Sequence, residues 1–265
     1  MDWLLLMQAL LIGVFCYLGS VSSPWLLGVT GGYYVIGRPL VAGLIIGIIL
    51  GDIQTGIIMG VAVQAAFIAT ISTGGTQNQE ITYAAYGGIA LGILAGADVG
   101  VVVTLSIAIG ALGLILHNFM MVENSFWNDR AMCAAELGDT RGVFMNNVVF
   151  PQSINFLLRV VPIALAIYFG EAFVTQMLAV IPVKVINIMN VLGGLLPALG
   201  IALLLNLVLK NKWQLLFFLV GFVFIVFGVK NMIALTVVAG VIAYFIFLIE
   251  SNRDGGQFVE KDEVI

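Results

Sequence analysis

Residues 31–80 read GGYYVIGRPLVAGLIIGIILGDIQTGIIMGVAVQAAFIATISTGGTQNQE. From Leu40 to Thr70 this stretch is apolar except for a few side chains, and one membrane span needs about 20 such residues. The rest of the chain is similar, because 62% of its 265 residues are hydrophobic and 9% are charged. In soluble domains about a quarter of the residues are charged, so this composition excludes an ordinary soluble domain. We expect an all-α polytopic membrane protein with multiple transmembrane helices.

Five more apolar runs predict the other membrane segments. They cover residues 4–19, 83–119, 160–180, 191–209 and 213–248. The second and the last of these runs are too long for one crossing, and breaks at 97–100 and 228–231 divide them. Each of the two therefore predicts a helical hairpin. No Lys or Arg precedes the first run, so we expect it to be a retained segment rather than a secretory signal peptide.

The distribution of Lys and Arg predicts the orientation in the membrane. If the polar segment 120–159 is inside, seven basic residues share its side: Arg130, Arg141, Arg159, Lys210, Lys212, Arg253 and Lys261. Only Lys184 and Lys230 then fall opposite, and Arg38 is not assigned to a side, so the positive-inside rule places that segment and the C-terminus in the cytoplasm.

The domain organisation follows from the same pattern. We expect one membrane-embedded permease domain over residues 1–250, including a cytoplasmic loop at about 120–159, and a disordered acidic cytoplasmic tail over 251–265. Within the loop, residues 122–152 predict either a solvated connection or a surface that docks a partner.

Charge, cysteines and motifs exclude several classes of function. The formal net charge is −4 and the pI about 4.8, whereas a nucleic-acid-binding surface needs clustered Lys and Arg. Cys16 and Cys133 have no CxxC or histidine neighbour and predict neither a metal site nor a disulfide. The sequence contains no Walker A, GxSxG or HExxH motif. We expect no catalytic residue, cofactor or metal, and we expect the single histidine, His117, to be an interfacial side chain.

Glycines recur between residues 43 and 60, and one acidic residue lies among them. Gly43, Gly47 and Gly51 are typical of close helix packing in membranes, and packing alone accounts for their spacing. It does not account for Asp52, which lies inside the apolar run. A carboxylate at membrane depth costs several kcal/mol unless it faces protein or water, so Asp52 is a candidate for a functional role.

The polar segment that follows this apolar run in the sequence predicts the binding site. The apolar run after Gln64 is only about half a span long, and it ends in the sequence STGGTQNQE. This pattern predicts a re-entrant helical hairpin around residues 60–80, because non-helical backbone is tolerated at depth only where protein or water covers it. The hairpin would bring Gln64, Thr73, Asn78 and Glu80 together near the membrane midplane. Their amide, hydroxyl and carboxylate groups favour a sugar over a metal cation as the ligand.

The order of glycines, acid and amide in this stretch resembles a family signature. It reads Gly47-x3-Gly51-Asp52-x3-Gly56-Ile57-Ile58-x-Gly60-x3-Gln64, which is similar to the pattern of the mannose-type phosphotransferase-system membrane component C, enzyme IIC. The sequence departs from that pattern at Val61, where the family usually has a second glycine, and at Gln64, where Glu is commoner. Two other segments also resemble the family, Arg38-Pro39-Leu40 and Gly193-Gly194-Leu195-Leu196-Pro197-Ala198. The likeness therefore covers nearly the whole chain.

The resemblance implies a sugar-translocating subunit of a phosphoenolpyruvate-dependent phosphotransferase system in the bacterial inner membrane. It implies a second membrane subunit, IID, and a complex of several IIC–IID pairs that moves a hexose or amino sugar by an elevator mechanism. Cytoplasmic IIA and IIB proteins would relay the phosphate, and a histidine of IIB would donate it to the sugar at the cytoplasmic face. The chain itself is then no enzyme.

Site roles follow from this resemblance. The four polar residues of the hairpin contact the sugar in this interpretation. The site is braced by Gly47, Gly51, Asp52, Gly56 and Gly60. The alternative is an ion-coupled secondary sugar transporter, in which Asp52 and Glu80 bind a proton or a sodium ion beside a broken helix. A third option is a structural membrane subunit without substrate contact.

Overall fold

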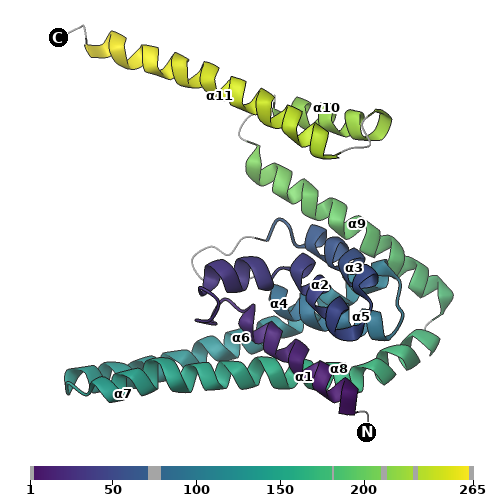
Figure 1. Ribbon diagram of the computed structural model, residues 1–265, viewed down its shortest axis with the longest axis vertical. Coiled ribbons are helices and arrows are strands. Elements are labelled where there is room, and N and C mark those ends of the chain that lie inside the picture. The colour runs from purple at the N-terminus through teal and green to yellow at the C-terminus, as the bar shows by residue number, and fades with distance from the viewer. Residues whose placement is uncertain (1–2, 71–78, 181, 210–213, 229–231, 263–265) are drawn as a thin grey trace. The chain divides into compact units, whose positions relative to one another are not determined.

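The computed structural model describes residues 3–70, 79–180, 182–209, 214–228 and 232–262, and every regular element in these ranges is a helix. The predicted all-α class is therefore confirmed. The chain forms two compact units, Met1–Leu205 and Asn206–Ile265. Figure 1 shows the helices, coloured from purple at the N-terminus to yellow at the C-terminus.

Eleven α-helices and three π-helices, the latter labelled η, make up the described chain. In chain order they are α1 (Trp3–Leu18), η1 (Val29–Ile36), α2 (Pro39–Leu50), α3 (Ile53–Ala66), α4 (Ile81–Tyr83), η2 (Ala84–Gly88), α5 (Ile89–Leu94), α6 (Val99–Glu136), α7 (Thr140–Phe144), η3 (Met145–Val149), α8 (Phe150–Val180), α9 (Val183–Val208), α10 (Gln214–Phe227) and α11 (Met232–Asp262). One of the two breaks expected within the long apolar runs is confirmed, because α5 ends at Leu94 and α6 begins at Val99. Of the other, residues 229–231 lie outside the described residues.

Three helices among the described residues are long and apolar enough to cross a membrane. They are Val99–Glu136, Thr140–Gly170 and Val183–Val208. A fourth crossing is added if η1 and α2 count as one broken span, because these two apolar helices meet at an angle of 72°. This arrangement agrees with the predicted polytopic membrane protein.

Helices α2 and α3 form a hairpin in which backbone packs directly against backbone. A Cβ atom at Gly47 would lie 2.8 Å from the Cα of Ile53, and one at Gly60 would lie 2.7 Å from the carbonyl oxygen of Pro39. Gly51 ends α2 with a φ of +85°, a left-handed conformation that favours glycine. Close packing and the sharp turn thus explain the glycine spacing of this stretch.

The interior of the first unit is the segment formed by α4, η2 and α5. Every residue from Ile81 to Gly92 is buried. The hydroxyl of Tyr86 in this segment donates a hydrogen bond of 2.9 Å to the carbonyl of Ile36, the last residue of η1. Helices α2, α3, α6 and α8 pack around the segment, and α1 lies across α8 (Figure 1). Glu80 stands directly before α4 and therefore enters this buried interior.

The expected loop at about 120–159 is largely helical. Helix α6 continues past residue 120 to Glu136, because residues 122–136 contain no Gly or Pro to end it. The chain turns at Gly138, whose φ is +69°, and α7, η3 and α8 return beside α6 (Figure 1). The carboxylate of Asp139 caps the start of α7 by accepting a hydrogen bond of 2.9 Å from the Gly142 amide. A change from apolar to polar residues near position 120 thus marks no helix end.

Two further expectations concern segments near or outside the described ranges. The turn of the predicted re-entrant hairpin falls on residues 71–78, which lie outside the described residues. Before it, α3 ends at Ala66, and after it α4 begins at Ile81. In the second unit α11 extends to Asp262, into the segment where we expected a disordered tail. The single domain over residues 1–250, the tail and the cytoplasmic side of segment 120–159 stay predictions.

Candidate functional site

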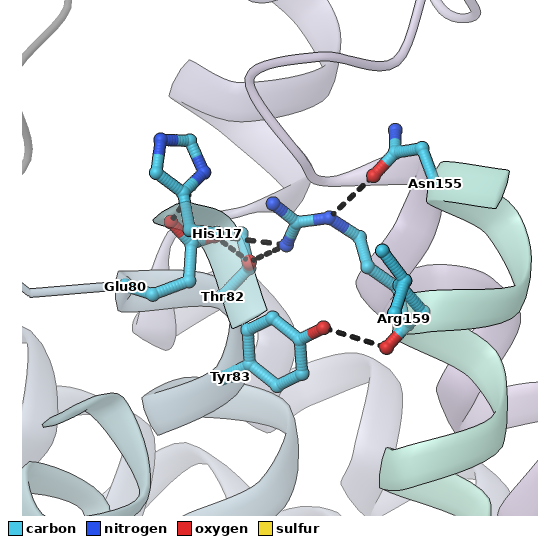
Figure 2. A network of polar contacts seen from close by, with 7 residues as sticks. Glu80, Thr82, Tyr83, His117, Asn155 and Arg159 are labelled. Carbon is cyan, nitrogen blue, oxygen red and sulfur yellow. Dashed lines mark hydrogen bonds and ion pairs between the residues drawn. The ribbon is translucent and has the colours of Figure 1, made fainter. Parts of the chain in front are cut away.

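Glu80 and Arg159 form a buried ion pair inside the first unit (Figure 2). The Nη1 atom of Arg159 donates to Oε1 of Glu80 at 2.8 Å, and the exposed fractions of the two residues are 1% and 0%. Arg159 lies on α8, whereas Glu80 precedes α4, so the pair joins segments that are 79 residues apart in the sequence. A lone charge at such a buried position is strongly destabilising, so each residue depends on the other.

Three neighbours complete the surroundings of the guanidinium group. The hydroxyl of Thr82 donates to Glu80 Oε1 at 2.6 Å and accepts from Arg159 Nη1 at 2.6 Å. Asn155, one helical turn before Arg159, accepts from its Nε atom at 3.2 Å through Oδ1. The guanidinium carbon lies 5.2 Å from the ring centroid of Tyr83, within the range of cation–π contact. Charge, hydrogen bonds and an aromatic face therefore all hold Arg159 in one position (Figure 2).

His117 on α6 faces the same carboxylate. Its Nδ1 atom lies 3.8 Å from Oε2 of Glu80, and the residue is only 5% exposed. Neither of these two atoms has a hydrogen-bond partner within the described part of the chain. His117 is thus not the interfacial side chain that the sequence predicted. Side chains from the start of α4, from α6 and from α8 meet at one buried carboxylate.

Of the four residues predicted to contact the substrate, the structure describes two. Glu80 belongs to the buried network just described. Gln64 lies half-buried on α3, and its Oε1 atom is buried without a hydrogen-bond partner among the described residues. Thr73 and Asn78 lie outside the described residues. The described chain therefore joins Glu80 to Arg159, Thr82 and His117, and leaves one amide oxygen of Gln64 available.

The residues predicted to brace the site lie in the α2–α3 hairpin. Asp52 is exposed at its turn and caps α3 by accepting a hydrogen bond of 3.0 Å from the amide of Thr55. The glycines at the backbone contact and turn of this hairpin include Gly47, Gly51, Gly56 and Gly60. This part of the sequence signature therefore corresponds to a capped turn between two closely packed helices.

The sequence did not predict that Arg159 and His117 belong to this network. Arg159 directly precedes the apolar run 160–180, so in the sequence it resembles a cation that flanks a membrane span. Because it is buried against Glu80, six basic residues rather than seven support the predicted orientation. The four-residue spacing of Asn155 and Arg159 places both on one helix face and was the available signal.

Within the described ranges, no group of three or more His, Cys, Asp or Glu residues comes together as a metal site. The ion pair consists of one acid and one base, so it adds no net charge to the interior. Beside it, Oε2 of Glu80 and Nδ1 of His117 have no hydrogen-bond partner among the described residues. Each can form a hydrogen bond with a small polar group. The network is therefore a neutralised polar centre in an otherwise apolar helical unit.

Comparison with known sequences gives consistent relatives. The family model described as "PTS system sorbose-specific iic component" matches residues 6–245. The mannose-specific EIIC component of the PTS system of Escherichia coli K12 is 29% identical over 208 residues, which are 78% of this chain and 77% of that protein. The N-acetylgalactosamine permease IIC component 1 of the same strain is 25% identical over 221 residues, 83% and 82% of the two chains. The fructose permease IIC component of Bacillus subtilis 168 is 24% identical over 196 residues, 74% and 72% of the two chains.

Two solved structures share the fold, and each aligns over 94% of this chain and 96% of its own. One is described as a membrane protein and has a TM-score of 0.78. The other is the mannose transporter ManYZ in complex with microcin E492, with a TM-score of 0.57. Both are 24% identical in sequence, so these likenesses concern the fold alone. The family model, in contrast, matches nearly the whole membrane part of the sequence, and the chain therefore belongs to the sorbose-type IIC family of the sugar phosphotransferase system.

Proposed function

We propose that the chain imports a hexose or an amino sugar, which a partner IIB protein phosphorylates at the cytoplasmic face. The observation that carries this proposal is the family match over residues 6–245, with relatives named for mannose, fructose and N-acetylgalactosamine. The buried centre around Glu80 supports it, because a pair of opposite charges leaves the interior of the unit neutral and suits an uncharged substrate. The phosphoryl donor is a histidine of IIB, so this chain acts as a permease subunit.

The partners in the proposal are IID in the membrane and the IIA and IIB proteins in the cytoplasm. Several IIC–IID pairs form the complex in the bacterial inner membrane, and an elevator movement carries the sugar. The fold likeness to the mannose transporter ManYZ supports a membrane partner. Six basic residues against two support a cytoplasmic C-terminus, on the side where IIB would act.

The sugar contacts in the proposal are Gln64, Thr73, Asn78 and Glu80, with Asp52 bracing the hairpin before them. The unpartnered Oε1 atom of Gln64 supports its role, because a buried acceptor without a partner is costly and a sugar hydroxyl would satisfy it. Glu80 offers only Oε2 to a sugar, since Oε1 already accepts hydrogen bonds from Arg159 and Thr82. Its larger contribution is to hold α4 against α8.

The ion-coupled transporter is the outcome that an experiment must separate from this proposal. Asp52 is used as a helix cap, and Glu80 is paired with Arg159. Each carboxylate therefore already has one oxygen engaged within the protein, and the positive charge of Arg159 beside Glu80 disfavours a coupling cation there, which favours the phosphotransferase subunit.

Uptake by membrane vesicles that contain the assembled complex tests the proposal. With phosphoenolpyruvate and the soluble phosphotransferase proteins supplied, we expect Gln64→Ala to abolish sugar uptake. The matched control is Gln54→Ala, which removes an exposed amide from the same helix and should leave uptake intact. Normal uptake by Gln64→Ala would remove Gln64 from the site. Uptake that stops with an ionophore, yet continues without the soluble proteins, would refute the phosphotransferase role itself.

A further inference from the structure

A polar cavity of about 450 Å³ lies between α6 and the η3–α8 segment of the first unit. Its size is within the range of small-molecule sites, about 300–1,000 Å³. Five asparagines and one glutamine contribute to its lining, together with Ser22 and Ser125. None of the described residues that line it is charged. This density of side-chain amides is unlike the rest of the apolar unit.

Two atoms at this cavity are buried and have no hydrogen-bond partner in the described part of the chain. One is Nδ2 of Asn155, a donor on a residue that is only 2% exposed. The other is Oδ1 of Asn124, an acceptor on α6. A buried polar atom without a partner is destabilising, so a donor and an acceptor that line one cavity are suited to a ligand that both accepts and donates hydrogen bonds.

Other amides of the cavity are fixed by the protein itself. The side chain of Gln152 donates to the carbonyl of Ser22 at 2.8 Å and accepts from the Tyr17 hydroxyl at 3.0 Å. The side chain of Asn146 donates to the carbonyl of Gly142 at 2.8 Å. These bonds tie one wall of the cavity to the end of α1 and another to α7. Two of the amides that line the cavity are therefore fixed by hydrogen bonds to the protein.

Asn155 connects the cavity to the buried ion pair. Its Oδ1 atom accepts from Arg159 at 3.2 Å, so the orientation of the amide is set, and its Nδ2 atom is left at the cavity. A ligand that accepts a hydrogen bond from Nδ2 therefore contacts the residue that positions Arg159. Arg159 in turn is paired with Glu80 (Figure 2).

We propose that this cavity is a second sugar-binding site, which takes a neutral hexose and rejects its phosphate ester. Side-chain amides both donate and accept hydrogen bonds, and thus match the hydroxyl groups of a polyol. The described lining residues include no Lys or Arg, the residues that would bind a phosphate. The site lies where α6 passes into its polar part, on the predicted cytoplasmic side. The choice of sugar rests on the proposed function. The site would hold the sugar before phosphorylation and release the sugar phosphate.

Equilibrium binding to the purified full-length chain in lipid nanodiscs tests this proposal. The probes are radiolabelled mannose, fructose, sorbose, N-acetylgalactosamine and mannose 6-phosphate, and Gln64→Ala is the background that removes the other predicted site. We expect one neutral sugar to bind and the phosphate ester not to compete. Asn124→Ala should weaken binding about fivefold, the effect of one lost neutral hydrogen bond. Asn118→Ala removes an exposed amide from the same helix, away from the cavity, and should bind like the background.

Asn155→Asp is the second variant, because it keeps an acceptor for Arg159 and replaces the free Nδ2 donor with a carboxylate oxygen, which cannot donate a hydrogen bond to the sugar when ionised. It should also weaken binding at least fivefold. Equal binding by the background, Asn124→Ala and Asn155→Asp would overturn the proposal, as would failure of every neutral sugar to bind or tight binding of the phosphate ester. If sugar binding depends on Asn124 but vesicle uptake needs no phosphotransferase proteins, the cavity stands and the proposed function fails.

Discussion

The ion pair between Glu80 and Arg159 makes a quantitative prediction about stability. Removing one partner of a buried pair costs about 3–5 kcal/mol, because the other charge stays buried without compensation. We expect Glu80→Gln to lie near the lower end, since the guanidinium keeps the acceptors of Thr82 and Asn155. We expect Arg159→Met to lie near the upper end, because the Glu80 carboxylate then keeps only the Thr82 hydroxyl. The double variant buries no charge and should be more stable than Arg159→Met.

Thermal unfolding of the purified chain in nanodiscs measures these effects. For a domain of 150–250 residues, 1 kcal/mol changes Tm by about 2–4 °C, so Arg159→Met should lower Tm by about 10–20 °C. The matched controls are Glu136→Gln and Arg141→Met, which change an exposed acid and an exposed base. Both should unfold close to the parent chain.

Additive losses would refute this account. If the double variant loses the sum of the two single effects, the charges are not coupled, whatever the distance between them. Single variants that unfold with the controls would likewise show that the pair does not hold α4 to α8.

Three other predictions concern single contacts and can be measured by the same unfolding experiment. Gly56→Ala should destabilise the α2–α3 hairpin by about 1–3 kcal/mol, because the added Cβ would meet backbone atoms of α2. The control is Gly194→Ala, whose Cβ would have no neighbour within 4 Å in the described part of the chain and which should not destabilise the protein. Equal Tm values for the two variants would contradict the close packing of α2 and α3. Tyr86→Phe should cost about 1 kcal/mol by removing the hydrogen bond to Ile36, while the exposed Tyr34→Phe should be neutral. Asp52→Ala should lower Tm and Asp52→Asn should restore it, since Asn caps helices as well as Asp does; a low Tm for both would show that the charge, rather than the cap, is required.

The helical architecture was predictable because apolar runs and their breaks are local properties of the sequence. Asp98 and its neighbours mark the start of α6 in the sequence as clearly as in the structure. The end of α6 was not predictable from hydropathy, because residues 122–136 change from apolar to polar without any residue that ends a helix. The extent of an apolar run measures contact with lipid, and the extent of a helix depends on capping and turn residues.

The site was predictable only in part, for a different reason. Glu80 is conspicuous because an acid next to apolar segments demands an explanation. Its partner Arg159 looks like an ordinary flanking cation, and His117 like an interfacial side chain, because pairing across 79 residues leaves no local pattern. Only the packing of α8 and α6 around α4 reveals which charge neutralises which.

The sequence distance between the two partners also has a consequence for biosynthesis. A ribosome that adds about 5–20 residues per second completes Glu80 about 4–16 s before Arg159, which follows 79 residues later. During that interval the nascent chain carries an acid for which its cation has not yet been made. Translation that stops before Arg159 leaves this acid permanently uncompensated, whereas a finished chain conceals it. The pair therefore distinguishes chains truncated before Arg159 from longer ones, because only the longer ones can neutralise Glu80.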